Sequence, residues 1–230
     1  MEMRHELKYV ITPVQYIMLR SRLKPIMQLD EHSREDGNYF IRSIYFDSYQ
    51  YDALNNKNNG VWKRKKYRLR FYNGDARECL LECKIKEGDR IEKISSPITR
   101  AEAEELLETK AGSIMYSSDS LMGEMKILMK NRGFKPVVLV DYLREAYVYP
   151  VSTLRITFDM EIAAGTVKDC LKKERCFSNI LPYGQMILEV KYDQYIPEHI
   201  SHIISSIQPV QRAASKYAMC VTEKLEGRII

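Results

Sequence analysis

Lysine and arginine recur at every second position in several short stretches of this sequence. In one stretch Lys66, Arg68 and Arg70 alternate with apolar side chains. Successive side chains of a β-strand point to opposite faces, so this spacing puts the cations on one face and the apolar residues on the other. Guanidinium groups bind phosphate oxygens in pairs, and ammonium groups act as mobile point charges. The stretch could therefore hold an anion that carries several charges.

The same alternation occurs in other stretches, where carboxylates stand among the cations. An ordinary half-exposed antiparallel sheet and a closed sheet with its charged faces inside both fit this pattern. The closed sheet is favoured because the polar faces carry mostly charges, and because amphipathic helices need an apolar outer surface to cover. The further charged faces hold Glu6 and Lys8; Glu82, Lys84 and Lys86; Arg155, Thr157 and Asp159; and Glu189 and Lys191.

The elements that must position these side chains alternate irregularly between strands and helices. Such an order favours an α+β fold with an antiparallel sheet. We predict one domain over residues 1–230, built as a closed antiparallel eight-stranded β-tunnel with a charged interior and helices packed outside. The predicted strands cover residues 6–11, 39–47, 65–72, 79–86, 90–95, 137–149, 154–160 and 185–192. The predicted helices run from Thr12-Pro13 to residue 27, after Thr99, and over residues 118–131, 197–207 and 210–225, and residues 29–38 are predicted as a loop.

Composition excludes several classes of protein. The five cysteines form no C-x-x-C pair, which argues against a disulfide framework or a structural zinc site. The sequence starts without a signal-peptide pattern and contains no apolar run of membrane-spanning length, so we expect a cytoplasmic protein. The net charge of +5 does not by itself indicate a nucleic-acid binder. The basic run Lys63–Lys66 is typical of a solvated strand entrance, and it could also guide polyanions toward a tunnel mouth.

Eight short motifs stand in the order seen in a known family. The sequence resembles, over residues 4–217, the VTC domain, which is the polyphosphate polymerase domain of the triphosphate tunnel metalloenzyme or CYTH-like superfamily. The motifs are Arg4–Tyr9, Arg42–Asp47, Lys66–Arg70, Leu81–Lys84, Tyr142–Arg144, Leu154–Asp159, Leu188–Lys191 and Ser215–Tyr217.

The resemblance implies transfer of the ATP γ-phosphate to a growing polyphosphate chain, with a divalent metal that is Mn²⁺ rather than Mg²⁺. It implies catalytic roles for Arg68, Arg70, Lys84, Arg144, Arg155 and Lys216. Substrate binding falls to Lys8, Lys93, Tyr142 and Lys191, where Lys93 is a looser match. Metal binding falls to Glu189, with Glu6 and Glu82 as further candidates. The implied partners are ATP, inorganic phosphate or pyrophosphate, and polyphosphate, with a separate membrane protein as a possible further partner and no duplex nucleic acid.

One departure from the wider superfamily bears on the reaction. The triphosphatases and cyclases of that superfamily carry Glu-x-Glu-x-Lys on the first strand, and Arg4 stands here in place of the first glutamate. Simple triphosphate hydrolysis thereby becomes less favoured. Two alternatives stay open, namely a tripolyphosphatase and a non-catalytic module that binds polyphosphate or nucleotide. The carboxylates could also serve only as charge balance, as Glu189 would do beside Lys191.

Overall fold

Eight long antiparallel strands close into a ring. The computed structural model describes residues 4–108, 120–170, 174, 176 and 178–229. The ring runs β7-β3-β4-β5-β6-β1-β10-β8, and β8 pairs again with β7. The junction between β1 and β6 is short, with Arg4 opposite Ile91 and His5 opposite Arg90. The strands are β1 (Arg4–Ile11), β3 (Asn38–Asp47), β4 (Lys63–Tyr72), β5 (Asp75–Glu87), β6 (Arg90–Ile98), β7 (Lys135–Val148), β8 (Arg155–Gly165) and β10 (Met186–Tyr192).

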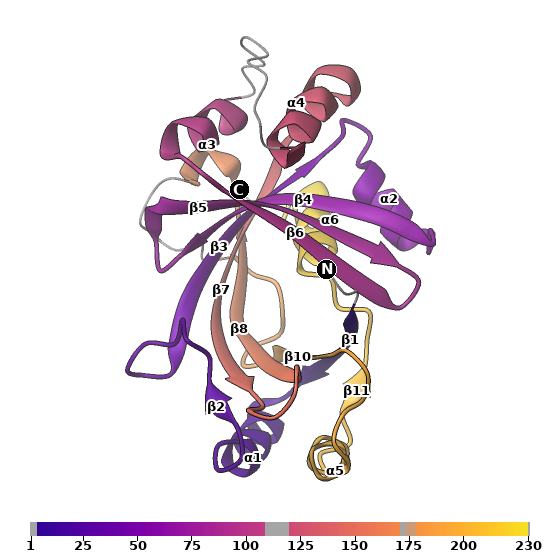
Figure 1. Cartoon of the computed structure of the whole chain (residues 1–230). Coiled ribbons are helices and arrows are strands. Elements are labelled where there is room, and N and C mark those ends of the chain that lie inside the picture. Colours follow the sequence, from indigo (N-terminus) through magenta and orange to yellow (C-terminus); the bar gives the residue numbers. More distant parts are fainter. Residues whose placement is uncertain (1–3, 109–119, 171–173, 175, 177, 230) are drawn as a thin grey trace.

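The predicted eight-stranded antiparallel fold is thus confirmed, and several strands extend beyond their predicted ends. Three short strands attach to the ring: β2 (Gln28–Leu29) on β7, β9 (Ser178–Asn179) on β8 and β11 (Val210–Gln211) on β1. Figure 1 shows the long strands curving around a common interior, with helices at both ends of the molecule.

Local capping signals start two of the helices where the sequence predicts them. Thr12 accepts a hydrogen bond from the backbone N–H of Gln15, whose side chain accepts one from the backbone N–H of Thr12, and Pro13 opens α1 (Pro13–Leu23). Thr99 and Glu102 make the same reciprocal cap for α3 (Arg100–Leu107).

Helix α2 (Asp52–Asn58) is absent from the sequence prediction, because the cap comes from an upstream strand. The carboxylate of Asp47, at the end of β3, accepts hydrogen bonds from the backbone N–H groups of Ala53 and Leu54. The same carboxylate accepts a hydrogen bond from the hydroxyl of Tyr217. One buried aspartate therefore ties α2 to the C-terminal helix.

Four helices cover the outer surface of the ring. Helices α1 and α5 (Glu198–Ser205) pack against outward-facing apolar residues such as Phe158 and Leu188. Helices α3 and α4 (Ser120–Arg132) pack against a second outer cluster that includes Leu69 and Leu81. These residues alternate along their strands with the charged ones, as the pattern predicts. None of the helices in the described part of the chain combines the length and apolarity that a membrane crossing requires.

Helix α6 (Lys216–Leu225) is the exception to the expectation of helices outside the ring. Its Tyr217, Ala218 and Val221 share a core with apolar residues that continue the inner faces of the strands, among them Val140 and Ile187. The inner faces are therefore charged along one part of the tunnel and apolar along the rest. The apolar part holds α6, and the helix N-terminus meets the charged part.

The predicted helix over residues 210–225 is wrong in its first residues. Val210 and Gln211 pair with β1 as strand β11, and the helix starts at Lys216 behind the cap of Ser215. Strand pairing with an existing edge outweighs the weak helical spacing there. In the predicted loop 29–38, Leu29 belongs to β2 and pairs with Tyr147.

One buried carboxylate fastens α1 to the ring. Glu145 on the outer face of β7 accepts hydrogen bonds from Tyr16 and, at 2.8 Å, from the Nε of Arg20 on α1. Tyr147 donates a third at 2.6 Å. Glu145 is 1% exposed, so these three donors replace water as its hydrogen-bond partners.

Replacing Glu145 by alanine should lower the free energy of unfolding by about 2–3 kcal/mol, because three donors lose their acceptor in a buried place. Chemical denaturation measures this loss. Tyr16→Phe, which removes one donor, should cost about 1 kcal/mol. Equal stability of Glu145→Ala and the parent chain would contradict this account of the α1 anchor.

Candidate functional site: a cation-lined tunnel

A cavity of about 150 Å³ lies inside the ring, in its charged part. Eleven of its lining residues are lysine or arginine and two are glutamate, so the cavity carries a large positive excess. Residues 213–217, at the start of α6, also line it. The cations come from different strands: Lys8 from β1, Arg64, Lys66, Arg68 and Arg70 from β4, Lys84 and Lys86 from β5, Arg144 from β7 and Lys191 from β10, together with Lys57 from α2 and Lys216 from α6.

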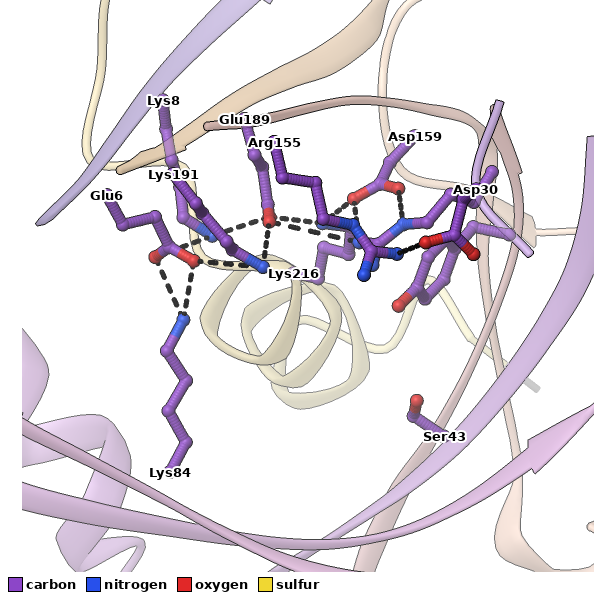
Figure 2. Close-up of polar contacts among 12 residues, drawn as sticks. Glu6, Lys8, Asp30, Ser43, Lys84, Arg155, Asp159, Glu189, Lys191 and Lys216 are labelled. Carbon is purple, nitrogen blue, oxygen red and sulfur yellow. Dashed lines mark hydrogen bonds and ion pairs between the residues drawn. The ribbon is translucent and has the colours of Figure 1, made fainter. Parts of the chain in front are cut away.

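Glu189 is the centre of the deeper network of ion pairs. Its Oε1 accepts hydrogen bonds from Lys8 at 2.7 Å and from Lys216 at 2.8 Å, and Lys191 Nζ lies 3.3 Å from its Oε2. Figure 2 shows these side chains converging from β1, β10 and α6. Burial alone would raise the pKa of Glu189, but Lys216 and Lys8 hold it well below its usual range. Glu189 is therefore ionised at neutral pH.

Glu6 forms the second carboxylate of this network. Lys84 reaches across from β5 and donates to both of its oxygens, at 2.8 and 2.9 Å (Figure 2). Lys8 lies 3.5 Å from the same carboxylate and so joins it to Glu189. Burial opposes ionisation of Glu6, yet Lys8 and Lys84 lower its pKa below the usual range.

Arg144 and Asp159 form a bidentate pair, with Nε–Oδ1 at 2.6 Å and Nη2–Oδ2 at 2.8 Å. Lys216 also contacts Asp159, which is fully buried. The pKa values of Arg144 and Lys216 are raised, because the carboxylates of Asp159 and Glu189 outweigh the opposing effect of burial. Asp159 thus fixes the orientation of two predicted catalytic cations.

Strand β4 carries two more of the predicted arginines, Arg68 and Arg70, and the paired strand β5 carries Glu82. Arg68 donates to Glu82 at 2.6 Å and to the Tyr45 hydroxyl at 3.1 Å. Arg70 donates to the hydroxyl of Tyr142 at 3.0 Å and lies 3.6 Å from Glu82. Despite its burial, Glu82 keeps a pKa well below the usual range because of these arginines. Glu82 thus orients Arg68 and Arg70, and the cavity wall keeps its excess of positive charge.

Arg155 and Lys93 are two of the predicted site residues that do not line the cavity. The Nη2 of Arg155 pairs with Asp30 at 3.0 Å and donates to the Tyr39 hydroxyl at 3.0 Å. Its Nε is buried and has no partner in the described part of the chain. Lys93 bonds Glu82 at 2.9 Å, and Ile91, which shares its face of β6, lines the cavity, so this face of β6 points inward. All the other predicted site residues except Glu82 line the cavity.

The predicted site residues do not include four cations that line the cavity at its mouth: Lys57, Arg64, Lys66 and Lys86. The strand period had already placed Lys66 and Lys86 on charged faces, and Arg64 continues the alternation of Lys66, Arg68 and Arg70. Lys57 lies on α2, and no strand pattern predicts its place. Tyr45, Ser215 and Tyr217 also line the cavity.

The electrostatics of Lys66 differ from those of the deeper lysines. Its Nζ donates to Ser215 at 3.0 Å and contacts no carboxylate among the described residues. Burial, together with the neighbouring cations Lys84, Lys8, Arg64 and Lys57, lowers the pKa of Lys66 to about 7. Burial also lowers the pKa of Lys84 to about 8, although Glu6 opposes the shift.

The donors for a divalent metal are limited. No group of three metal-ligating side chains occurs in the described residues. Glu189 and Glu6 both approach Lys8, so they face one region of the cavity. Mg²⁺ is commonly bound through one or two carboxylates together with substrate phosphates and water. The donor set fits such a metal, held jointly by Glu189, Glu6 and the phosphates of a substrate.

Three solved structures share the fold at low identity. A candidate adenylyl cyclase from Hippeastrum, described as having a dominant triphosphatase activity, matches with a TM-score of 0.56 and 16% identity over 96% of each chain. A candidate adenylate cyclase from Bacillus halodurans matches with a TM-score of 0.53 and 14% identity, over 93% of this chain and 94% of that chain. One from Vibrio parahaemolyticus gives 0.53 and 14%, over 95% of this chain and 97% of that chain. No curated protein matches the sequence.

A closed ring of eight antiparallel strands around a cation-lined cavity is the architecture of the triphosphate tunnel class, and the solved structures share the fold. Within this class the family model of the VTC domain matches residues 3–223. The chain belongs to the VTC domain family. The family places it among polyphosphate-related tunnel proteins.

A polyanion should stabilise this protein, because it neutralises cations that repel one another in the empty cavity. At a tripolyphosphate concentration of a hundred times Kd, the free energy of unfolding should rise by about 2.7 kcal/mol. Thermal or chemical unfolding with and without tripolyphosphate measures this rise. At the same concentration Arg70→Ala should show a smaller rise, and Arg100→Ala, on the surface of α3, should keep the full one. Equal rises in all three proteins would place the anion outside the cavity.

The lowered pKa of Lys66 predicts a pH-dependent stability. An unfolded lysine keeps its proton up to a pH of about 10.4, whereas folded Lys66 loses it near pH 7. Between these values the unfolded state binds more protons, so the contribution of Lys66 to stability rises with pH. Lys66→Met should therefore be more stable than the parent chain at pH 6, and this advantage should shrink by pH 9. Urea denaturation at both pH values measures it, and a constant difference would contradict the shift.

Proposed function

We propose that this protein is an ATP-dependent polyphosphate polymerase, which adds the γ-phosphate of ATP to the end of a phosphate chain inside the tunnel. The observation that carries the proposal is the deep cavity wall, where Arg68, Arg70 and Arg144 face inward and are each held in place by a carboxylate. Such a wall supplies fixed positive charge with little reorganisation, which is what phosphoryl transfer requires of a protein.

The reaction needs no nucleophilic side chain, because the attacking atom is a terminal oxygen of the phosphate chain. That oxygen forms a bond to the γ-phosphorus, the bond between the γ-phosphorus and the β–γ bridging oxygen breaks, and ADP leaves with the bond's electron pair. Arg68, Arg70 and Arg144 would hold non-bridging oxygens, and Tyr142 would orient Arg70. Lys8, Lys84 and Lys216 would neutralise the charge that develops on the leaving oxygen and on the chain end.

Arg155, Lys93 and Lys191 would bind other parts of the substrate. The partnerless Nε of Arg155 could donate to a phosphate oxygen outside the main cavity. Glu189, with Glu6 beside it, would hold a divalent metal, for which we propose Mn²⁺. Such a metal would act as a Lewis acid on the phosphate oxygens. Glu82 bonds Arg68 and Lys93 and is the less suited metal ligand.

A second candidate function is hydrolysis of tripolyphosphate. The similar Hippeastrum protein is described as having a dominant triphosphatase activity, and the two chains share the tunnel fold. In this chain Arg4 pairs with Asp193 at 3.0 Å, at the position where the wider superfamily carries a glutamate. With one fewer carboxylate on β1, polymer formation is the favoured reaction.

Incubation of the protein with ATP and Mn²⁺ tests the proposal. Chains that lengthen with time on a gel, together with release of ADP, support the polymerase. Orthophosphate alone supports the hydrolase, and tight binding without turnover supports a binding module. Arg70→Ala should lower the rate by about a hundredfold or more, because it removes a fixed cation from the site of charge development.

Two controls sharpen the test. Glu189→Gln should lose most of its Mn²⁺-dependent activity, because an amide cannot supply the anionic ligand. Arg100→Ala should retain the parent rate. Full Mn²⁺-dependent activity of Glu189→Gln would move the metal role to another carboxylate, with Glu6 first.

A further inference from the structure

The cations at the mouth of the cavity differ from the deeper ones in that no carboxylate of the described residues pairs with them. We name Lys57, Arg64, Lys66 and Lys86 the mouth cluster. In the described part of the chain none of them lies within ion-pair distance of a carboxylate: Lys57 donates to Asn58, Arg64 to the Val61 carbonyl and Lys66 to Ser215. The deeper cations Lys8, Arg68, Lys84, Arg144, Lys191 and Lys216 all contact carboxylates.

Strand pairing places cations of this region directly opposite one another. Arg64 on β4 faces Lys86 on β5, and Lys66 faces Lys84. Like charges in opposite positions of neighbouring strands destabilise a sheet. Both pairs are half-buried and point into the same cavity. Glu6 compensates Lys84 in the second pair, whereas no described carboxylate pairs with Arg64, Lys86 or Lys66. An anion beside these three cations would relieve their repulsion.

The length of the cationic row limits the kind of anion that can use all of it. Arg64, Lys66, Arg68 and Arg70 occupy one face of β4, and six residues of strand span about 20 Å at a rise near 3.4 Å per residue. A group of three linked phosphates that is bound at Arg68 and Arg70 is shorter than this row. A longer inorganic phosphate chain could run from the deep wall past Lys66 to Arg64 and Lys86.

The N-terminus of α6 lies along the same path. Ser215 caps this ten-residue helix and receives the Lys66 hydrogen bond, and residues 213–217 line the cavity between the deep wall and the mouth. The partial positive charge of a helix N-terminus favours anions. All four residues of the mouth cluster carry cationic side chains, which favours the phosphates of a ligand, while Ile91 and Tyr217 are apolar or aromatic neighbours in the same cavity.

We propose that the mouth cluster is an additional phosphate subsite, which makes the protein select inorganic phosphate chains longer than a triphosphate. The inference rests on the proposed function, because it extends the same tunnel site. The deep wall binds the first phosphates of any ligand, and the mouth cluster binds only those units that extend beyond them. The mouth cluster therefore distinguishes ligands by the length of their phosphate chain and not by a nucleotide.

Calorimetric titration of tripolyphosphate, long-chain polyphosphate and ATP tests the subsite without turnover. In the double variant Arg64→Met/Lys86→Met, affinity for long-chain polyphosphate should fall roughly tenfold or more, since two charge-assisted contacts are lost. Affinity for tripolyphosphate should change less than about threefold, because charges beyond a Debye length are largely screened. The dependence of long-chain affinity on salt should also become less steep, as fewer cations are neutralised.

Matched control variants distinguish the effect of the mouth cations on affinity from a general effect of removing positive charge. Lys63→Met/Lys65→Met removes two cations from the outer face of the same strand, where Glu87 and Glu124 pair with them, and it should leave both affinities unchanged. The single variant Arg64→Lys, which keeps Lys86 and a cation at position 64, should retain most of the parent's affinity for long-chain polyphosphate. Removing facing cations relieves repulsion, so the mouth variants should fold, which thermal unfolding checks.

Each outcome decides between the two proposals. Equal loss of affinity for tripolyphosphate and long chains, or loss for ATP alone, would overturn the mouth subsite and leave the deep site standing. Equal long-chain affinity of the parent and double variant would also overturn it. A parent protein that binds none of the three ligands would overturn the proposed function itself.

Discussion

Repulsion among cations inside a closed ring is the constraint on which this structure depends. Eleven lysines and arginines line one cavity, and Glu6 and Glu189 are the carboxylates among its described lining residues. Asp159 and Glu82 lie behind this lining and hold Arg144 and Arg68. Without these four carboxylates the deep wall would carry uncompensated buried charge, which is strongly destabilising. With them the wall is ordered and still positive.

These carboxylates stabilise the fold, and this role is compatible with the metal binding proposed for Glu189. Glu189 pairs with Lys8 and Lys216. In the proposed function a phosphate chain would offer those lysines new partners, and Glu189 would then be available to a metal. The same atoms could thus stabilise the ligand-free tunnel and serve the loaded one. This exchange links the stability of the ring to the ligand that it is proposed to bind.

Helix α6 connects the core of the protein to its site. The helix fills the apolar part of the ring interior, and its first residue, Lys216, reaches Asp159 and Glu189 in the charged part. Asp47 holds the next residue, Tyr217, and also caps α2, which carries Lys57 of the mouth cluster. Packing of the C-terminal helix therefore positions cations both in the deep wall and at the mouth.

The sequence by itself determined the strands, their charged inner faces and the family. A period of two is a local property, so Lys66, Arg68 and Arg70 indicate their shared face without any knowledge of the fold. Only the tertiary structure decided which cations have counterions. Lys84 meets Glu6 from a strand 78 residues away, whereas Lys66 meets no carboxylate among the described residues. Ring closure and the inward position of α6 set these distances, because contacts between remote segments depend on packing that no local pattern encodes. The fold thus divides the regular basic rows of the sequence into a deep wall with paired charges and a mouth whose cations pair with no described carboxylate.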